Sequence, residues 1–113
     1  MKTNSERLAE INELTIRLKK EVPGEIDAFM KFMNATEKST VLDVKYKHLI
    51  DIALAVSAQC EWCIALHVKN AVNAGATKEE ILEAAMQAVL MHGGPALMYM
   101  IPVEKAIAEF TQA

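Results

Sequence analysis

Apolar residues recur along this chain at helical spacing, and no segment shows the alternation of apolar and polar residues that marks a half-buried β-strand. Alanine, leucine, methionine, glutamate, lysine and isoleucine are abundant, whereas aromatic residues make up only 5% of the chain, and this bias favours helix over sheet. The pattern therefore predicts an all-α fold. A length of 113 residues corresponds to one domain, which we expect to span residues 1–113.

About six helices are expected, separated by capping and helix-breaking residues. They are a first helix over residues 4–21, a second beginning at Pro23, a third over 44–58, a fourth over 60–73, a fifth from the cap at residue 77 to residue 91, and a sixth beginning at Pro95. Thr77 and Glu80 have the spacing of a capping box and give the clearest boundary. Asn4 or Ser5 is expected to cap the first helix, and Pro102 is expected to kink or split the last one.

The charge balance and the hydropathy argue against a nucleic-acid binder and against a membrane-spanning protein. The net charge is −3, from 12 basic and 15 acidic residues, so the chain lacks the basic footprint of a nucleic-acid binder. No apolar run approaches the ~18 residues that a membrane span needs, and no apolar core of a signal peptide follows Met1. We therefore expect a cytoplasmic protein without nucleic-acid or membrane partners. In a reducing compartment, its two cysteines are more often redox-active or metal-binding than structural.

Cys60, Cys63 and His67 fall on one stripe of the fourth expected helix. Cys60 and Cys63 are about 60° apart around the helix, and Cys63 and His67 about 40° apart. His67 lies one turn beyond Cys63 and two turns beyond Cys60, so its imidazole reaches the sulfur of Cys63 more easily. Helical Cα atoms three residues apart are separated by about 5 Å, which a disulfide accepts. The two cysteines can therefore bond to each other without unfolding the helix.

Reactivity requires a thiolate, and this segment offers two ways to lower a thiol pKa. Both cysteines lie near the start of a helix, where unpaired N–H groups favour negative charge. A histidine one turn on can also accept the proton of Cys63 or pair with its thiolate. Helix position alone favours Cys60 as the nucleophile, whereas the reach of His67 favours Cys63. We prefer Cys63 as the nucleophile, with Cys60 as the resolving cysteine.

Three motifs carry a resemblance to a known family. They are Cys-x-x-Cys-x-x-x-His at 60–67, Asn-Ala-Gly-Ala-Thr-Lys-Glu-Glu-Ile at 73–81 and Gly-Gly-Pro-Ala at 93–96. Over about residues 42–107 the chain resembles the carboxymuconolactone decarboxylase and alkylhydroperoxidase D-like superfamily. The resemblance implies an all-α bundle that assembles as a homotrimer or a homohexamer. Because the cysteine pair is present, the chain resembles the peroxidase branch rather than the decarboxylase branch.

The resemblance implies a thiol-dependent peroxidase with an antioxidant role. In the peroxidase branch, the residue matching Cys63 attacks a hydroperoxide, and the residue matching Cys60 resolves the sulfenic acid into a disulfide. The residue matching His67 belongs to the proton relay. A lipoylated or thioredoxin-like protein then reduces the disulfide, so the expected partners are a hydroperoxide substrate and a thiol electron donor. No cofactor and no bound metal are expected.

One position departs from the pattern of the peroxidase branch. That branch has a glutamate, the base of the relay, twelve residues before the first cysteine, and the residue at this position is His48. Histidine can also accept a proton near neutral pH, so His48 is a candidate for the relay. Asp51 or Glu61 is an alternative acid, but the spacing singles out neither of them.

Other functions fit the same residues. One is a disulfide oxidoreductase that exchanges disulfides with a protein or a small thiol, without peroxide chemistry. Another is a metal-binding module with Cys60, Cys63 and His67 as ligands and His48 or His92 as the fourth, although helical spacing makes tetrahedral closure awkward. The last is a non-catalytic assembly protein whose cysteines only pack.

Overall fold

The structure is a computed structural model that describes residues 2–111, and over this range it is all-helical, which confirms the expected fold class. The helices are α1 (Asn4–Glu21), α2 (Pro23–Thr36), α3 (Val44–Ser57), α4 (Glu61–Asn73), α5 (Lys78–His92), α6 (Gly94–Met98) and α7 (Met100–Thr111). The last expected helix is divided into α6 and α7 at Tyr99. Pro102 explains the break, because it has no N–H to donate to the carbonyl of Met98.

Local signals account for the start of α5 and the end of α4. Thr77 and Glu80 form the expected capping box, because the Thr77 hydroxyl accepts from the Glu80 N–H while the Glu80 carboxylate accepts from the Thr77 N–H. Two residues earlier, Gly75 adopts a φ of 93°, a left-handed conformation that is typical of glycine after a helix.

The expected cap of α1 at Asn4 or Ser5 is wrong by one or two residues. Thr3 caps the helix instead, in a second capping box with Glu6. Asn4 and Ser5 lie inside the first turn, where their N–H groups donate to the carboxylate of Glu109 on α7, at 3.2 and 2.8 Å. This contact fastens the first turn of α1 to the C-terminal helix.

The core lies where α3, α4, α5 and α7 meet. α3 packs against both α4 and α5, and α4 also packs against α7. The largest fully buried side chains come from these four helices: Ile52, Val56, Ile64, Val68, Ile81 and Val103. Within this bundle, α3 and α7 hold the cysteine-bearing helix α4 in place.

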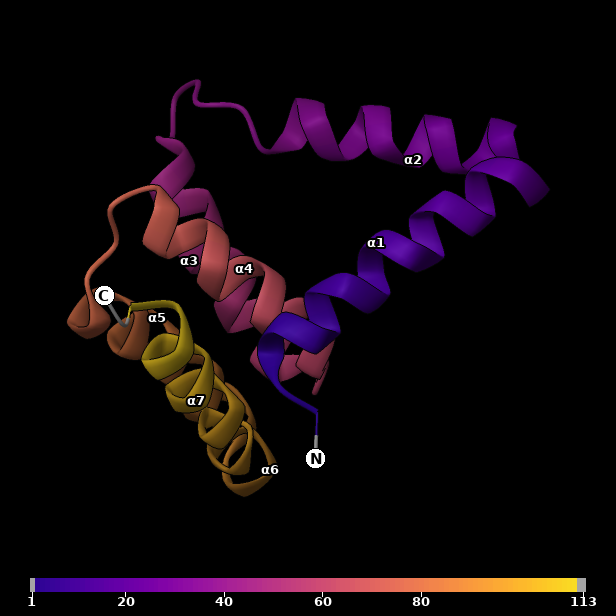
Figure 1. The fold of residues 1–113 in the computed structure, drawn as a ribbon. Coiled ribbons are helices and arrows are strands. Elements are labelled where there is room, and N and C mark those ends of the chain that lie inside the picture. Colours follow the sequence, from indigo (N-terminus) through magenta and orange to yellow (C-terminus); the bar gives the residue numbers. More distant parts are fainter. Residues whose placement is uncertain (1, 112–113) are drawn as a thin grey trace.

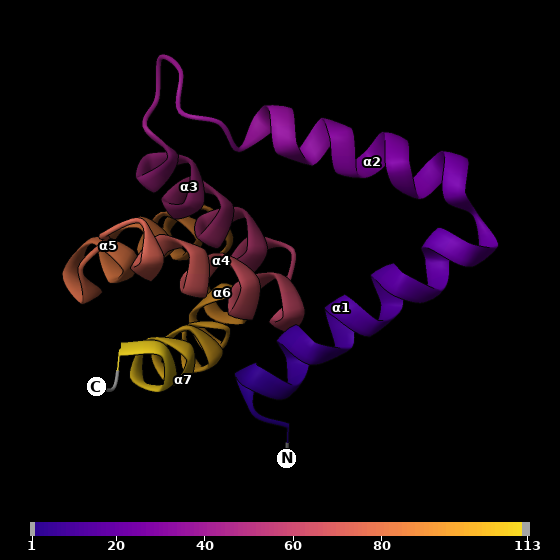
Figure 2. The ribbon, with the colours of Figure 1, turned by 45° about the horizontal axis from the view of Figure 1, so that its top comes forward.

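α1 and α2 form a V beside the bundle, as Figures 1 and 2 show from two directions. The N-terminal part of α1 lies against the bundle, where α1 contacts α4 and α7, and α2 leads back towards α3. α2 packs mainly on α1 and contains no buried residue. The bend falls between Val22 and Pro23, which takes the first helical position of α2. The inner side of the V therefore faces α4.

Large apolar side chains stay exposed on α2 and α5. Phe29 and Phe32 on α2 are 55% and 66% exposed, and Leu90 and Met91 on α5 are 75% and 76% exposed. Exposed apolar surface of this kind often marks interaction sites, so these residues are candidate contacts for the assembly that the family resemblance implies. None of the helices within residues 2–111 combines the length and the hydropathy needed to cross a bilayer.

Candidate redox site

Cys60 and Cys63 are joined by a disulfide at the start of α4. Cys60 is the N-cap, with extended backbone, so the helix begins one residue later than expected. Its sulfur accepts a hydrogen bond from the N–H of Cys63 at 3.2 Å. The Cα atoms of the two residues are 5.3 Å apart, close to the spacing expected from helical geometry. Both sulfur atoms therefore lie in the first turn of α4, where the helix dipole favours a thiolate.

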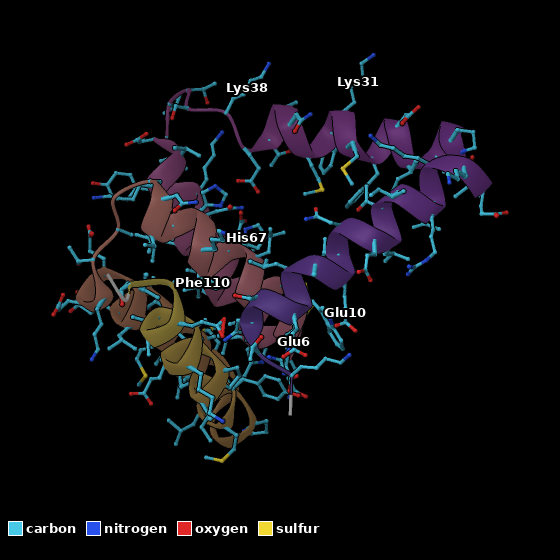
Figure 3. All side chains as sticks on the ribbon, in the orientation of Figure 1. Glu6, Glu10, Lys31, Lys38, His67 and Phe110 are labelled. Atoms are coloured by element: carbon cyan, nitrogen blue, oxygen red, sulfur yellow. A yellow bond between two sulfur atoms is a disulfide. The ribbon has the colours of Figure 1, made fainter. Side chains whose placement is uncertain are left out.

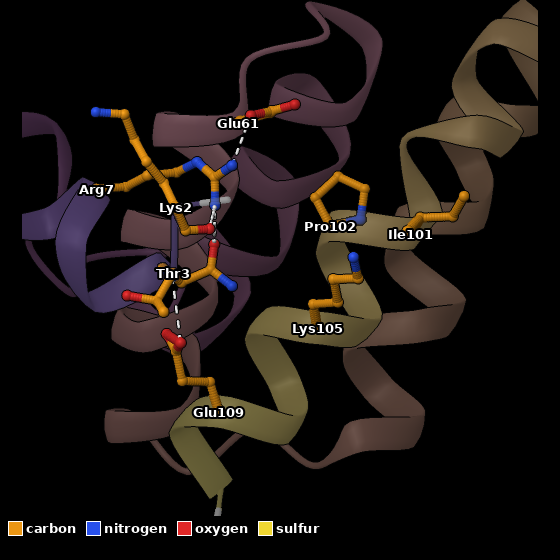
Figure 4. Close-up of a pocket in the computed structure, with 9 residues that line it drawn as sticks. Lys2, Thr3, Arg7, Glu61, Ile101, Pro102, Lys105 and Glu109 are labelled. Atoms are coloured by element: carbon orange, nitrogen blue, oxygen red, sulfur yellow. Dashed lines mark hydrogen bonds and ion pairs between the residues drawn. The ribbon is translucent and has the colours of Figure 1, made fainter.

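The first half of α1 is fastened to this turn. The Arg7 guanidinium donates to the Glu61 carboxylate at 2.8 Å, a contact drawn in Figure 4. The indole N–H of Trp62 donates to the carboxylate of Glu10 at 2.9 Å. Glu61 and Trp62 are the two residues between the cysteines. These contacts place α1 beside the disulfide.

Cys63 and His67 line a cavity of about 490 Å³ between α4 and the inner side of the V. In Figure 3, His67 lies on α4, facing the space between α1 and α2. The walls are largely apolar and include Leu14 on α1 and Phe29 and Met33 on α2. Cys60 does not line this cavity. Of the two cysteines, it is therefore Cys63 that lines an apolar space together with an imidazole.

Four polar side chains, one of them His67, meet beside the cavity, and we call them the imidazole–carboxylate cluster. They are Glu37, His48, Asp51 and His67. The two Nδ1 atoms of His48 and His67 are 3.3 Å apart. Asp51 Oδ2 lies 3.4 Å from His67 Nδ1, and Glu37 Oε2 lies 3.5 Å from His48 Nδ1. The cluster joins the residue after α2 to the facing sides of α3 and α4.

Burial sets the protonation states in this cluster. It lowers the pKa of His48 and of His67, and the carboxylate of Asp51 opposes it in both cases. Burial, followed by the neighbouring carboxyl of Asp51, raises the pKa of Glu37 to about 7, and Lys47 acts in the opposite direction. Near neutral pH both imidazoles are therefore neutral, and His67 is able to accept a proton.

The structure brings His48 beside His67, as the relay hypothesis requires, and buries it, so it is not a solvated residue. Asp51 joins them because it lies three residues after His48 and so on the same face of α3. Sequence reasoning missed Glu37, because no spacing relates the end of α2 to α3. In this disulfide-bonded state the sulfurs of the metal-ligand set suggested by the sequence are bonded to each other, so they are not available as ligands, and His92 is exposed at the end of α5. The four cluster residues are themselves a set of possible metal ligands.

Glu37→Gln should stabilise the protein at alkaline pH. A carboxyl whose pKa is raised by folding binds its proton more tightly in the folded state. The ionised carboxyl therefore lowers the free energy of unfolding, an effect that grows from about pH 4.5 and is complete above about pH 7. The full shift would correspond to about 3 kcal/mol, but solvent screening of this partly exposed side chain reduces the expected gain to about 1 kcal/mol. Urea unfolding with a chelator at pH 8 and at pH 4.5 measures it.

The gain should appear at pH 8 and vanish at pH 4.5. The matched control is Glu13→Gln, which removes an exposed carboxylate of α1 far along the chain from the cluster. An equal stabilisation by both substitutions, or a Glu37→Gln effect that does not change with pH, would contradict the assignment of the raised pKa to this cluster.

The fold and the site together place this chain among all-helical proteins built around a cysteine pair at a helix start. Within that class, the chain belongs to the carboxymuconolactone decarboxylase family, whose model matches residues 23–106. The match runs from the start of α2 into α7 and includes the disulfide and the whole cluster. The resemblance found in the sequence motifs is thereby confirmed.

The chain is also similar to solved structures of this family and to a further bacterial protein. The crystal structure of an apo carboxymuconolactone decarboxylase family protein from Legionella pneumophila is 38% identical, with a TM-score of 0.92 over 96% of this chain and 97% of the other. A family member from Thermotoga maritima has a TM-score of 0.84 over 92% of this chain and 88% of its own, at 24% identity, and so shows the fold. An uncharacterized protein of Cupriavidus necator is 36% identical over 92% of this chain and 89% of its own length.

Proposed function

We propose that this protein is a thiol-dependent peroxidase in which Cys63 attacks a hydroperoxide and Cys60 resolves the product. The observation that carries the proposal is that Cys63 lines an apolar cavity together with His67. Cys60 does not line this cavity but is bonded to Cys63. The Thermotoga relative is described as a candidate for an antioxidative response, which agrees with this assignment.

The chemistry runs in two steps. The Cys63 thiol gives its proton to His67, and the thiolate attacks the terminal peroxide oxygen, so that an S–O bond forms and the O–O bond breaks. The leaving alkoxide takes the proton back from His67 and departs as an alcohol. The Cys60 thiol then attacks the sulfenic acid of Cys63, the S–S bond forms, and water leaves. Sulfur loses two electrons and the peroxide gains them.

The cluster supports the proton transfer to His67. Asp51 lies 3.4 Å from His67 Nδ1 and stabilises the imidazolium that forms when His67 takes the proton. His48 extends the same network, because its Nδ1 lies 3.3 Å from His67 Nδ1, and Glu37 Oε2 lies a further 3.5 Å from His48 Nδ1. The peroxidase branch has a glutamate at the position of His48, and Asp51 supplies a carboxylate in its place. His48 fixes the orientation of the His67 ring.

The cavity indicates which peroxides react. Its walls come from apolar side chains of α1 and α2, so an alkyl chain gains by leaving water there, at about 25 cal/mol for each Å² buried. Organic hydroperoxides should therefore react faster than hydrogen peroxide. As the family resemblance implies, a lipoylated or thioredoxin-like protein is the proposed reductant, and a homotrimer or a homohexamer is the proposed assembly.

The Cys60→Ser variant tests the proposal. Without a resolving thiol, Cys63 should stop as a sulfenic acid when an organic hydroperoxide is added, and a dimedone-type trap should label it about once per chain. Thiol counting in the wild type should show both thiols lost together. If no sulfenic acid forms while the wild-type disulfide still exchanges with an added dithiol, the protein is a disulfide oxidoreductase instead.

A further inference from the structure

The imidazole–carboxylate cluster has the geometry of a metal site. Each of its residues offers one ligand atom, and all four atoms lie within 4.8 Å of one another. Zinc–nitrogen and zinc–oxygen bonds of about 2.0–2.2 Å place tetrahedral ligand atoms about 3.4 Å apart. In the structure, the separations between ligand atoms around the two histidines are 3.3, 3.4, 3.5 and 3.8 Å. One small cation between the four atoms would therefore need only slight side-chain movement.

Hydrogen bonding within the cluster is incomplete. Glu37 Oε2 and Asp51 Oδ2 are both buried, and neither accepts a hydrogen bond from another described residue. Buried carboxylate oxygens of native proteins nearly always have a partner, so this pair calls for one. The Nδ1 atoms of His48 and His67 point to the same place and can share only one proton between them. A dication would satisfy both oxygens and both nitrogens at once.

We infer that the imidazole–carboxylate cluster binds one divalent transition-metal cation of the zinc type. Two imidazoles and two carboxylates form a mixed nitrogen and oxygen set, which suits zinc and its neighbours better than calcium or magnesium, whose ligands are oxygens. The cysteines take no part, because the ligand atoms belong to the other side chains and the sulfurs are bonded to each other. The inference goes beyond the proposed peroxidase and does not depend on it. A cation on His67 Nδ1 would leave the ring proton on the other nitrogen, so the metal-loaded state and the state in which His67 accepts the Cys63 proton are alternatives.

The cation would join the V to the bundle. Glu37 immediately follows α2, whose main packing partner is α1, whereas the other three ligands lie on α3 and α4. Because the ligands come from separate elements, the site exists only in the folded chain, and the cation should stabilise that state. Zinc should therefore raise the unfolding temperature of the wild type.

Zinc titration of the chelator-treated, disulfide-bonded wild type by calorimetry tests the inference. We expect about one cation per chain, with affinity reduced about 100-fold or more by Asp51→Asn or by His67→Gln. His92→Gln, at an exposed histidine outside the cluster, should bind as the wild type does. Thermal unfolding of each variant with chelator shows that it is folded, and zinc should raise the unfolding temperature only where the cluster is intact.

Cobalt(II) identifies the ligands and separates this inference from the proposed function. Bound cobalt should give visible bands of a nitrogen and oxygen site, without thiolate-to-cobalt charge transfer, in the wild type and in the Cys60→Ser, Cys63→Ser double variant. The double variant has no cysteine and therefore no peroxidase activity, so cobalt binding to it tests the metal site independently of the proposed function. Far less than one equivalent of zinc, equal affinity in the Asp51→Asn variant, or loss of cobalt binding in the double variant would overturn the inference.

Discussion

Cys63→Ser should reduce the rate of peroxide-dependent oxidation by about 1000-fold or more, because it removes the atom that forms the S–O bond. The remaining sulfur, Cys60, lies outside the apolar cavity that Cys63 shares with His67. It therefore lacks both the neighbouring proton acceptor and the surface that would hold an organic peroxide. Stopped-flow measurement of peroxide consumption under single-turnover conditions, starting from reduced protein, gives the rate of this first step.

Cys60→Ser is the matched control, because it changes the same atom type in the same helical turn. This variant should keep the first step within about threefold of the wild type and lose only disulfide formation. The comparison decides between the two cysteines. A slow first step in Cys60→Ser together with a fast one in Cys63→Ser would reverse the assignment and make Cys60, the N-cap residue, the nucleophile.

The sequence predicts the fold well because its signals are local. A capping box such as Thr77 with Glu80 involves only neighbouring residues, and Pro102 breaks its helix through the hydrogen bond that it cannot make. The cysteine geometry is local too, because residues three apart on a helix always share a face. The predicted cap of α1 is one or two residues late because Thr3, Asn4 and Ser5 are all acceptable cap residues. The capping box with Glu6 selects Thr3, and the N–H groups of Asn4 and Ser5 donate to Glu109 instead.

The site is predictable only as far as it lies within one helix. Cys63 and His67 follow from spacing along α4, and His48 from the family pattern. Glu37 comes from the end of α2, and the path of the chain between α2 and α3 brings it to His48. No periodicity in the sequence encodes that path. The imidazole–carboxylate cluster is thus a tertiary feature, and single-sequence reasoning could name some of its members but not its composition.

His67→Gln should slow the first step by about 100-fold at pH 7. Burial lowers the pKa of His67, so the ring is neutral at pH 7 and ready to take the proton of Cys63. Without it, the thiol returns towards its ordinary pKa near 8.5, and only about 3% of it is thiolate at pH 7. Loss of proton donation to the leaving alkoxide adds to this effect.

The pH profile distinguishes proton transfer from a merely structural role of His67. With a chelator present, the rate of the His67→Gln variant should climb about tenfold per pH unit up to about pH 8.5, as the Cys63 thiol ionises, so that its deficit shrinks in alkali. The wild-type rate should fall only below the ordinary histidine range, because burial outweighs the opposing effect of Asp51 on the His67 pKa. His92→Gln should leave the wild-type profile unchanged. A His67→Gln profile parallel to that of the wild type would mean that His67 shapes the cavity but does not move the proton.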